Sequence, residues 1–308
     1  MTSVAFAVPD DTVLVADGGL ATELEARGAD LSDPLWSARL LVDAPAEVTA
    51  VHADFFAAGA QIATTAGYQA SFEGFARHGI DRRGTVALLR RSVALARDAA
   101  AGRAGRWVAA SVGPYGAALA DGSEYRGRYG LSVARLAEWH RPRLEALADA
   151  GADLLACETV PDLDEAEALV NLLTRADVPA WLSFTIDGAA TRAGQPLAEA
   201  FAVAAGVPQI VAVGVNCCAP ADVLPAIEVA REVTGKPVIV YPNSGEHWAA
   251  GRWTGPGTFS PALVPAWVAA GARIVGGCCR VGPATIAAVA SEIRRACTQR
   301  ENPAGNSP

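Results

Sequence analysis

Three cysteines stand at the ends of two apolar runs in this sequence, where their thiols could act together. Cys217 belongs to "GVNCC", and Cys278 and Cys279 end the run "RIVGGCC". Neighbouring side chains in a strand point to opposite faces, so an adjacent pair inside a strand could not share one target. Two glycines directly before the pair favour a bend, because glycine in a strand often marks a bend or a close backbone approach. We therefore expect the three sulfurs to converge.

A set of three thiolates is typical of a zinc site. Zinc binds cysteine sulfur at about 2.3 Å, and a site with three protein ligands keeps a fourth position open for a substrate. Because three thiolates donate much charge, zinc held by them activates water poorly, whereas a substrate thiol at the open position loses its proton. The reaction that this chemistry favours is attack of a thiolate on an activated carbon.

We predict one Zn2+ ion per chain, with the ligands Cys217, Cys278 and Cys279. Cys218 should face away from the metal, because it follows the first ligand in strand geometry. The alternative is that these cysteines are small buried side chains, as we expect for Cys157 and Cys297. A disulfide between two neighbouring cysteines is a further alternative, although it would be strained.

Other polar side chains interrupt the apolar runs at the same end as the cysteines. They are Asp17, Thr64, Thr65, Glu158, Asn216 and Asn243. If the runs are parallel strands, these side chains meet at one mouth of the sheet, where barrel enzymes place their active sites.

The elements that must position these residues alternate regularly along the chain. Eight short apolar runs lie at 12–19, 61–67, 107–114, 153–160, 180–186, 210–218, 237–243 and 273–279, with amphipathic segments between them. Continuous apolar runs suit strands of a parallel sheet that is buried on both faces. The pattern predicts an α/β fold, a single-domain (β/α)8 TIM barrel over residues 1–308 with a frayed tail from about 300 to 308. A doubly wound open sheet is the alternative.

Composition limits the partners and the compartment. The 308 residues carry a formal net charge of -8, which argues against a nucleic-acid partner, and 51% of them are hydrophobic. The longest uncharged stretch is broken by Gly and Pro and does not resemble a membrane span. The N-terminus lacks a signal-peptide pattern, so we expect a cytoplasmic protein with reduced thiols that acts on small molecules. The oligomeric state cannot be read from the sequence.

Several other barrel chemistries are disfavoured by the residues available. Lys236 is the only lysine, and it stands at the entrance of a run rather than at its end, which disfavours Schiff-base and pyridoxal-phosphate chemistry. Of the four histidines, only His247 lies just past the end of a run. A histidine-rich hydrolytic centre is therefore not expected.

The motifs "DGG" near the N-terminus, "GVNC", and "GGCC" followed by proline resemble the homocysteine S-methyltransferases. "SVGPYGAALADGSEYRG" and "YPNSGEHW" resemble the branch that uses S-methylmethionine. The resemblance runs from about Val15 to about Ala288, which is nearly the whole chain. It implies a (β/α)8 barrel in which a zinc ion on three cysteines binds the thiolate of homocysteine.

The resemblance also implies roles for the remaining polar residues. Cys217, Cys278 and Cys279 match the metal ligands. Asp17 and Glu158 would hold the homocysteine amino group, Ser37 would lie near its carboxylate, and Asn216 would line the same pocket. No catalytic residue beyond the zinc centre is implied.

The expected function is transfer of a methyl group from a sulfonium donor to homocysteine, which gives methionine. S-methylmethionine is the first choice of donor, S-adenosylmethionine the second and betaine the last. Aromatic residues such as Tyr125 and Trp248 could face the donor cation. The alternatives are a sugar-phosphate barrel with structural cysteines, and a regulator that binds zinc or thiols without turnover.

Overall fold

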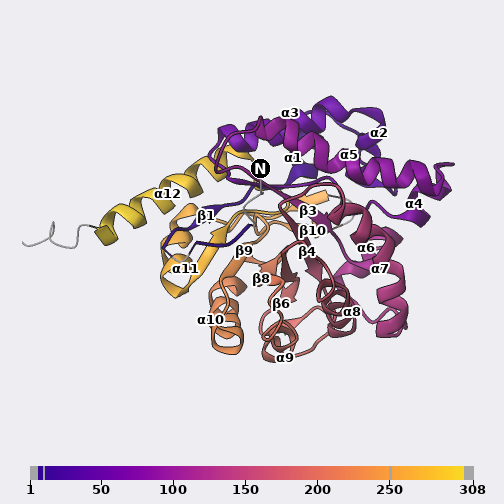
Figure 1. The fold of residues 1–308 in the computed structure, drawn as a ribbon. Coiled ribbons are helices and arrows are strands. Elements are labelled where there is room, and N and C mark those ends of the chain that lie inside the picture. The colour runs from indigo at the N-terminus through magenta and orange to yellow at the C-terminus, as the bar shows by residue number, and fades with distance from the viewer. Residues whose placement is uncertain (1–5, 10, 250–251, 302–308) are drawn as a thin grey trace, which may run out of the picture.

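The computed structural model describes residues 6–9, 11–249 and 252–301 of the chain. Eight parallel strands form one sheet in the order β1-β12-β9-β8-β5-β4-β3-β2 (Figure 1). A parallel bridge between Ala16 and Ile62 joins the two ends of this order, so the sheet closes on itself. The predicted (β/α)8 barrel is confirmed, and the alternative of an open doubly wound sheet is wrong.

Each barrel strand overlaps one of the eight predicted runs. The strands are β1 (Leu14–Val15), β2 (Ile62–Thr64), β3 (Trp107–Val112), β4 (Leu154–Val160), β5 (Ala180–Phe184), β8 (Ile210–Asn216), β9 (Val238–Tyr241) and β12 (Ala272–Val275). Their nearly continuous burial explains why the runs do not alternate between apolar and polar residues.

Helices surround the barrel on its outer side (Figure 1). The α-helices are α1 (Leu20–Ala26), α2 (Leu40–Asp43), α3 (Pro45–Ala57), α4 (Phe72–Arg77), α5 (Arg82–Ala100), α6 (Tyr115–Leu119), α7 (Val133–Ala148), α8 (Leu163–Leu173), α9 (Leu197–Ala202), α10 (Val223–Thr234), α11 (Val264–Ala270) and α12 (Pro283–Glu301). The 3-10 helices among the described residues are η1 (Trp36–Arg39), η2 (Ser123–Tyr125), η3 (Pro220–Asp222) and η4 (Pro261–Leu263).

Glycines follow the ends of three helices and turn the chain toward the next strand. Gly59, Gly151 and Gly271, from the near-identical segments "AAGAQI", "DAGADL" and "AAGARI", have φ angles of 104, 80 and 122°. This left-handed backbone is costly for residues with a Cβ atom, and it turns the chain from each helix into the next strand.

The barrel interior is packed and forms a floor under the mouth. Side chains from alternate strand positions meet there, among them Leu14, Ile62, Leu154, Trp181, Ala212, Ile239 and Ile274. The indole Nε1 of Trp181 donates a hydrogen bond to the Tyr241 hydroxyl at 3.0 Å. The two largest side chains of this interior are therefore fixed to each other, directly below the polar residues of the site.

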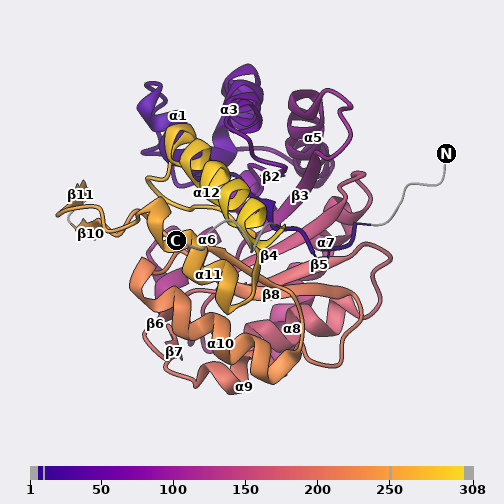
Figure 2. The same cartoon turned by 90° about the vertical axis from the view of Figure 1, so that its left-hand side faces the viewer.

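Two hairpins that the sequence did not predict lie on the side of the barrel where the strands end. They are β6 (Ile186–Asp187) with β7 (Ala190–Thr191), and β10 (His247–Ala249) with β11 (Arg252–Thr254). Figure 2 shows both on the same side of the barrel, and β10 and β11 project furthest. The side chain of Trp248, a suggested partner of the donor cation, lies outside the described residues.

No helix within the described ranges is both long and apolar enough to cross a membrane. Helix α12 extends to Glu301, so the first two residues of the predicted tail are helical. The rest of that tail, residues 302–308, lies outside the described residues.

Candidate metal and substrate site

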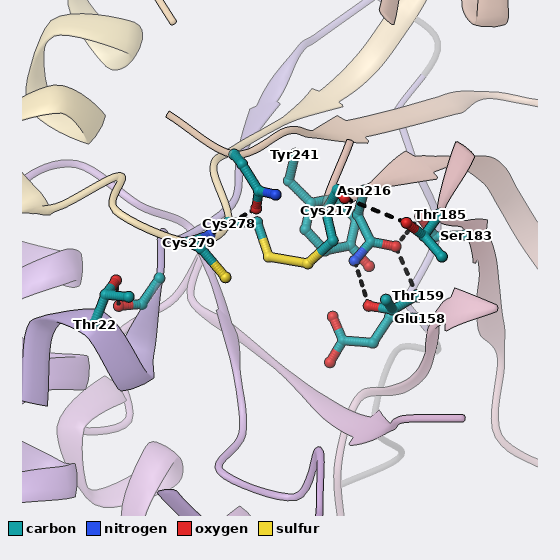
Figure 3. The surroundings of a disulfide bond; sticks show 12 residues. Thr22, Glu158, Thr159, Ser183, Thr185, Asn216, Cys217, Tyr241, Cys278 and Cys279 are labelled. Carbon is teal, nitrogen blue, oxygen red and sulfur yellow. Dashed lines mark hydrogen bonds between the residues drawn. A yellow bond between two sulfur atoms is a disulfide. The ribbon is translucent and has the colours of Figure 1, made fainter. Parts of the chain in front are cut away.

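The three predicted ligand cysteines meet at the mouth of the barrel. The sulfur atoms of Cys217, Cys278 and Cys279 all lie within 4.8 Å of one another (Figure 3). Two sulfurs bound at 2.3 Å to a tetrahedral zinc ion are about 3.8 Å apart, so a cluster of this size fits the metal. In the part of the chain that the structure describes, this is the one such group of metal-ligating side chains.

The adjacent cysteine pair escapes strand geometry because it lies beyond the end of β12. The N–H of Cys278 donates to the Pro242 carbonyl at 2.8 Å, and the N–H of Cys279 donates to the Asn243 side-chain oxygen at 3.1 Å. The turn closes with a bond from the Val281 N–H to the Cys278 carbonyl at 3.1 Å. These bonds to the end of the neighbouring strand β9 direct both thiols to the mouth.

The glycines before the pair are required by close backbone approach. A Cβ atom on Gly276 would come within 2.7 Å of the Asp17 carbonyl, and one on Gly277 would come within 2.1 Å of the Val281 side chain. The N–H of Gly277 donates to the Asp17 carbonyl at 3.0 Å. The bend predicted from these glycines therefore also fastens the cysteine turn to the end of β1.

Cys217 reaches the cluster by an unusual backbone conformation. Its φ of 49° lies in the left-handed region, which few residues other than glycine adopt. Its N–H donates to the Tyr241 carbonyl at 3.3 Å, and its own carbonyl accepts the Thr185 hydroxyl at 3.2 Å. Neighbouring strands thus hold the residue in the conformation that turns its sulfur inward.

The structure joins Cys217 and Cys278 as a disulfide (Figure 3). This pairing differs from the free thiols expected from the sequence, and the same two sulfurs belong to the cluster of three. The strained pairing of neighbours, Cys278 with Cys279, does not form, because Cys279 remains a free thiol. Only a thiolate binds zinc, so the disulfide must be reduced before the three cysteines can act as one ligand set.

The charges around the cluster favour a cation among the sulfurs. Burial raises the pKa of Cys279 to about 12, and the carboxylates of Glu158 and Glu124 add to this effect. A divalent cation at the centre of the cluster would oppose both causes and favour the thiolate. The soft sulfur donors and the negative surroundings therefore fit zinc.

Cys218 lies against the helical layer of the protein rather than in the cluster. It is 1% exposed and belongs to the outer hydrophobic core. Burial raises the pKa of its thiol to about 12, so the thiol remains neutral. This position supports the prediction that it faces away from the metal.

We accordingly expect Cys218→Ser to retain one zinc ion per reduced chain and most of the activity. The cost should appear as a loss of stability of roughly 1 kcal/mol, because a hydroxyl is placed in an apolar layer. Metal analysis and thermal unfolding measure the two effects separately. Loss of zinc with unchanged stability would contradict the assignment of this side chain.

Asp17 and Glu158 lie in the mouth as buried carboxylates, with exposed fractions of 3% and 7%. The Thr64 N–H donates to Asp17 Oδ2 at 2.8 Å, and the Ser111 hydroxyl donates to Glu158 Oε1. Burial raises the pKa of Asp17 to about 8, and the charge of Glu158 adds to it. Burial raises the pKa of Glu158 to about 7, although bonds from Ser111 and Tyr241 oppose the shift. Two carboxylates held in this way attract a bound ammonium group.

Asn216 lies behind Glu158, and its side chain is fully buried. Its Nδ2 donates to Thr159 Oγ1 at 2.7 Å, and its Oδ1 accepts the Thr159 N–H and the Ser183 hydroxyl, both at 2.8 Å (Figure 3). Thr159 has a φ of 57°, which is costly for a β-branched residue. The amide of Asn216 thus stabilises the strained residue that follows Glu158. Direct contact of Asn216 with substrate stays a prediction.

Ser37 is buried, with 3% exposure, in the short helix η1. Its neighbour Trp36 packs edge-on against Tyr68, with 6.3 Å between ring centroids. Burial raises the pKa of Tyr68, and the charges of Tyr125, Glu124 and Glu158 contribute, so η1 borders the same mouth. No hydrogen bond among the described residues joins Ser37 to Asp17 or Glu158, and its role toward a carboxylate stays a prediction.

Several residues that hold the site together were not predicted from the sequence. Ser111, Thr185 and Tyr241 contact Glu158 or the Cys217 backbone through the bonds given above. Ser111 and Tyr241 each stand as a polar residue near the end of an apolar run, which is the same signal that identified Glu158. These two could therefore have been found by applying that criterion to every run.

Comparison with known proteins gives a consistent result. The family model described as Homocysteine S-methyltransferase matches residues 14–293. A homocysteine S-methyltransferase of Escherichia coli K12 is 50% identical to this chain over 291 residues, which cover 90% of this chain and 94% of the relative.

Two crystal structures of the homocysteine methyltransferase MmuM from Escherichia coli are also similar. The metallated form has a TM-score of 0.82 at 48% identity and covers 92% of this chain and 96% of its own. The oxidized form has a TM-score of 0.82 at 49% identity and covers 91% and 95%. The relative has thus been captured in both a metal-bound and an oxidized state.

Proposed function

The chain belongs to the homocysteine S-methyltransferase family and methylates homocysteine, and we propose that it does so with one zinc ion and a sulfonium donor. The ligands in this proposal are Cys217, Cys278 and Cys279, and the donor is S-methylmethionine. The observation that carries the proposal is the convergence of three cysteine sulfurs beside two buried carboxylates. Zinc, when bound, supplies the positive charge that keeps the homocysteine sulfur a thiolate.

The residues of the mouth position the acceptor. Asp17 and Glu158 bind the ammonium group of homocysteine, and Ser37 lies near its carboxylate. The pKa values of the two carboxyl groups, about 8 and about 7, mean that neither is fully ionised at neutral pH in the free protein. A bound ammonium favours their charged forms, so binding of homocysteine is coupled to release of protons.

The methyl transfer itself requires no acid from the protein. The homocysteine sulfur forms a bond to the methyl carbon, and the bond from that carbon to the donor sulfur breaks with its electron pair going to the donor sulfur. A sulfonium thereby leaves as a neutral thioether, and the thiol proton is released to solvent. The protein contributes alignment of the two sulfurs on either side of the methyl carbon.

The negative surroundings of the mouth support a cationic donor. Asp17, Glu158 and Glu124 lie within electrostatic reach of one another or of the cysteines. The reaction also needs reduced cysteines, which supports a reducing compartment such as the cytoplasm. Family membership supports methyl transfer over the alternatives of a sugar-phosphate barrel and a regulator without turnover.

The proposal is tested with reduced, zinc-loaded protein, homocysteine and each donor in turn. Methionine formation is expected with S-methylmethionine, more slowly with S-adenosylmethionine and least with betaine. A strong chelator should abolish it, and added zinc should restore it. Activity that survives complete removal of the metal would contradict the zinc centre, and binding of homocysteine without turnover of any donor would favour the regulator.

A further inference from the structure

A methyl transfer between two amino acids brings two ammonium and two carboxylate groups into the mouth. Asp17 and Glu158 serve one ammonium, so the donor needs groups of its own. Two charged side chains at the edge of the mouth, which we call the rim, have unpaired atoms of the kind that bind ammonium and carboxylate groups. Within the described residues, Glu124 Oε2 and Arg192 Nε are buried and make no hydrogen bond. Buried polar atoms are nearly always paired, so each exception calls for an explanation.

The ion pair of Arg192 does not satisfy this guanidinium. Its Nη1 lies 3.7 Å from Asp187 Oδ2, and the Asp187 side chain is 82% exposed. Ion pairs at such exposed positions contribute little. Glu124 and Arg192 form no ion pair with each other in the described part of the chain. One carboxylate oxygen of Glu124 and the Nε of Arg192 are therefore available to a ligand.

Both residues lie close to the cysteine cluster. The backbone N–H of Arg192 donates to the Thr185 carbonyl at 3.2 Å, and the Thr185 hydroxyl donates to the Cys217 carbonyl at 3.2 Å. On the other side, the charges of Glu124 and Glu158 both act on the buried Tyr68. Arg192 is thus linked through Thr185 to Cys217, and Glu124 shares an electrostatic neighbour with Glu158 at the mouth.

Tyr125 connects the two charges. It follows Glu124 directly in η2, and its ring centroid lies 5.8 Å from the guanidinium carbon of Arg192. The residue is 38% exposed, although it borders a buried site. A partly exposed aromatic residue at this position offers a surface for the chain of a cationic ligand.

The segments that carry these residues are fixed to each other by Asp162. Its Oδ2 accepts the Arg128 N–H at 2.7 Å, and its Oδ1 accepts the Gln195 side-chain Nε2 at 2.6 Å. Arg128 lies in the segment that follows η2, and Gln195 lies just after the β6–β7 hairpin. These hydrogen bonds therefore hold the two segments, and the charges of Glu124 and Arg192 that they carry, at a fixed spacing.

We propose that Glu124 binds the ammonium group of the methyl donor and Arg192 binds its carboxylate group. The rim therefore selects donors that carry an α-amino acid group. This inference rests on the proposed function. It predicts that S-methylmethionine is preferred over sulfonium compounds that lack either group. Asp17 and Glu158, which bind the ammonium group of homocysteine, take no part in binding the donor.

The test uses reduced, zinc-loaded protein and three donors. They are S-methylmethionine, its deamino analogue dimethylsulfoniobutanoate and its decarboxy analogue aminopropyldimethylsulfonium. Glu124→Gln should lower kcat/KM about tenfold for the two donors that have an ammonium group and leave the deamino donor unchanged. Arg192→Gln should lower it about tenfold for the two donors that have a carboxylate and leave the decarboxy donor unchanged.

Matched controls remove a charge at nearby exposed positions, with Arg126→Gln on the same loop and Glu199→Gln in α9. Neither should change the ratios between donors. Zinc content and the KM for homocysteine should stay at wild-type values in all four variants. If Glu124→Gln lowers kcat/KM equally for all donors, the Glu124 carboxylate does not bind the ammonium group of the donor, and the proposal is overturned.

Turnover by the wild-type protein distinguishes a failure of the proposed function from a failure of the rim assignment. If no sulfonium methylates homocysteine, the proposed function fails and this inference fails with it. If S-methylmethionine is used but the variants keep the wild-type ratios between donors, only the rim assignment fails. A change of ratio confined to the matching donors supports both.

Discussion

Changing Cys217, Cys278 or Cys279 to serine, one at a time, is expected to remove zinc and homocysteine methylation together. A serine hydroxyl is a hard donor that is not deprotonated at neutral pH, so it replaces neither the softness nor the charge of a thiolate. Loss of a residue that only hydrogen-bonds a metal ligand lowers metal affinity roughly 10–100-fold, so loss of the ligand itself should lower it further. Metal analysis of the reduced protein and methionine formation measure the two losses.

Cys279→Ser is the most informative of the three variants. It leaves Cys217 and Cys278, the pair that the structure joins, unchanged, so a loss of zinc from the reduced protein is due to the Cys279 sulfur alone. Cys157→Ser is a matched control, because Cys157 is fully buried in the core and separate from the cluster. If Cys279→Ser still binds one zinc ion per chain with full activity, the ligand set is wrong.

The barrel and the position of its mouth could be predicted because they depend on periodic and local features. Continuous apolar runs identify strands buried on both faces, and parallel strands put all their C-terminal ends at one level. Residues at the ends of the runs, such as Asp17, Glu158 and Cys217, therefore had to lie near one another. The bend before Cys278 was likewise encoded locally, in its two glycines.

The details that could not be predicted depend on contacts between distant segments. The roles of Asn216 and Thr159 follow from three hydrogen bonds between strands that are not adjacent in the sequence. Glu124 lies in a short 3-10 helix, and Arg192 lies directly after a hairpin whose strands have two residues each. Elements this short have no periodic pattern in the sequence. The disulfide depends on the orientation of two sulfurs 61 residues apart in the chain.

Glu158→Gln should retain zinc but weaken homocysteine binding by about one to two orders of magnitude. The substitution keeps the size of the side chain and much of its hydrogen bonding, but it removes the charge that the ammonium group contacts. A hydrogen bond between charged partners is worth roughly 1.5–3 kcal/mol, and each 1.4 kcal/mol is about tenfold in affinity. Calorimetric titration of the zinc-loaded protein with homocysteine measures the change.

The control ligand is mercaptobutanoate, which keeps the thiol and the carboxylate of homocysteine but lacks the amino group. Its affinity should hardly differ between the wild type and Glu158→Gln. Because the thiol contributes equally to both ligands, the ratio of the two affinities isolates the ammonium contact. Loss of zinc from the variant, or an equal loss of affinity for both ligands, would make Glu158 a structural residue.

The pH dependence of this ratio provides an independent check on Glu158. Burial raises its pKa to about 7, so its carboxyl group becomes neutral as the pH falls through that value. The wild type should therefore lose its preference for homocysteine over mercaptobutanoate between about pH 8 and pH 6, and Asp17, with a pKa of about 8, contributes to the loss at the upper end. Glu158→Gln should show only the part of the loss that belongs to Asp17, because glutamine does not titrate. An unchanged pH profile in the variant would mean that the charge of Glu158 never contacts the ammonium group, even if the affinity falls.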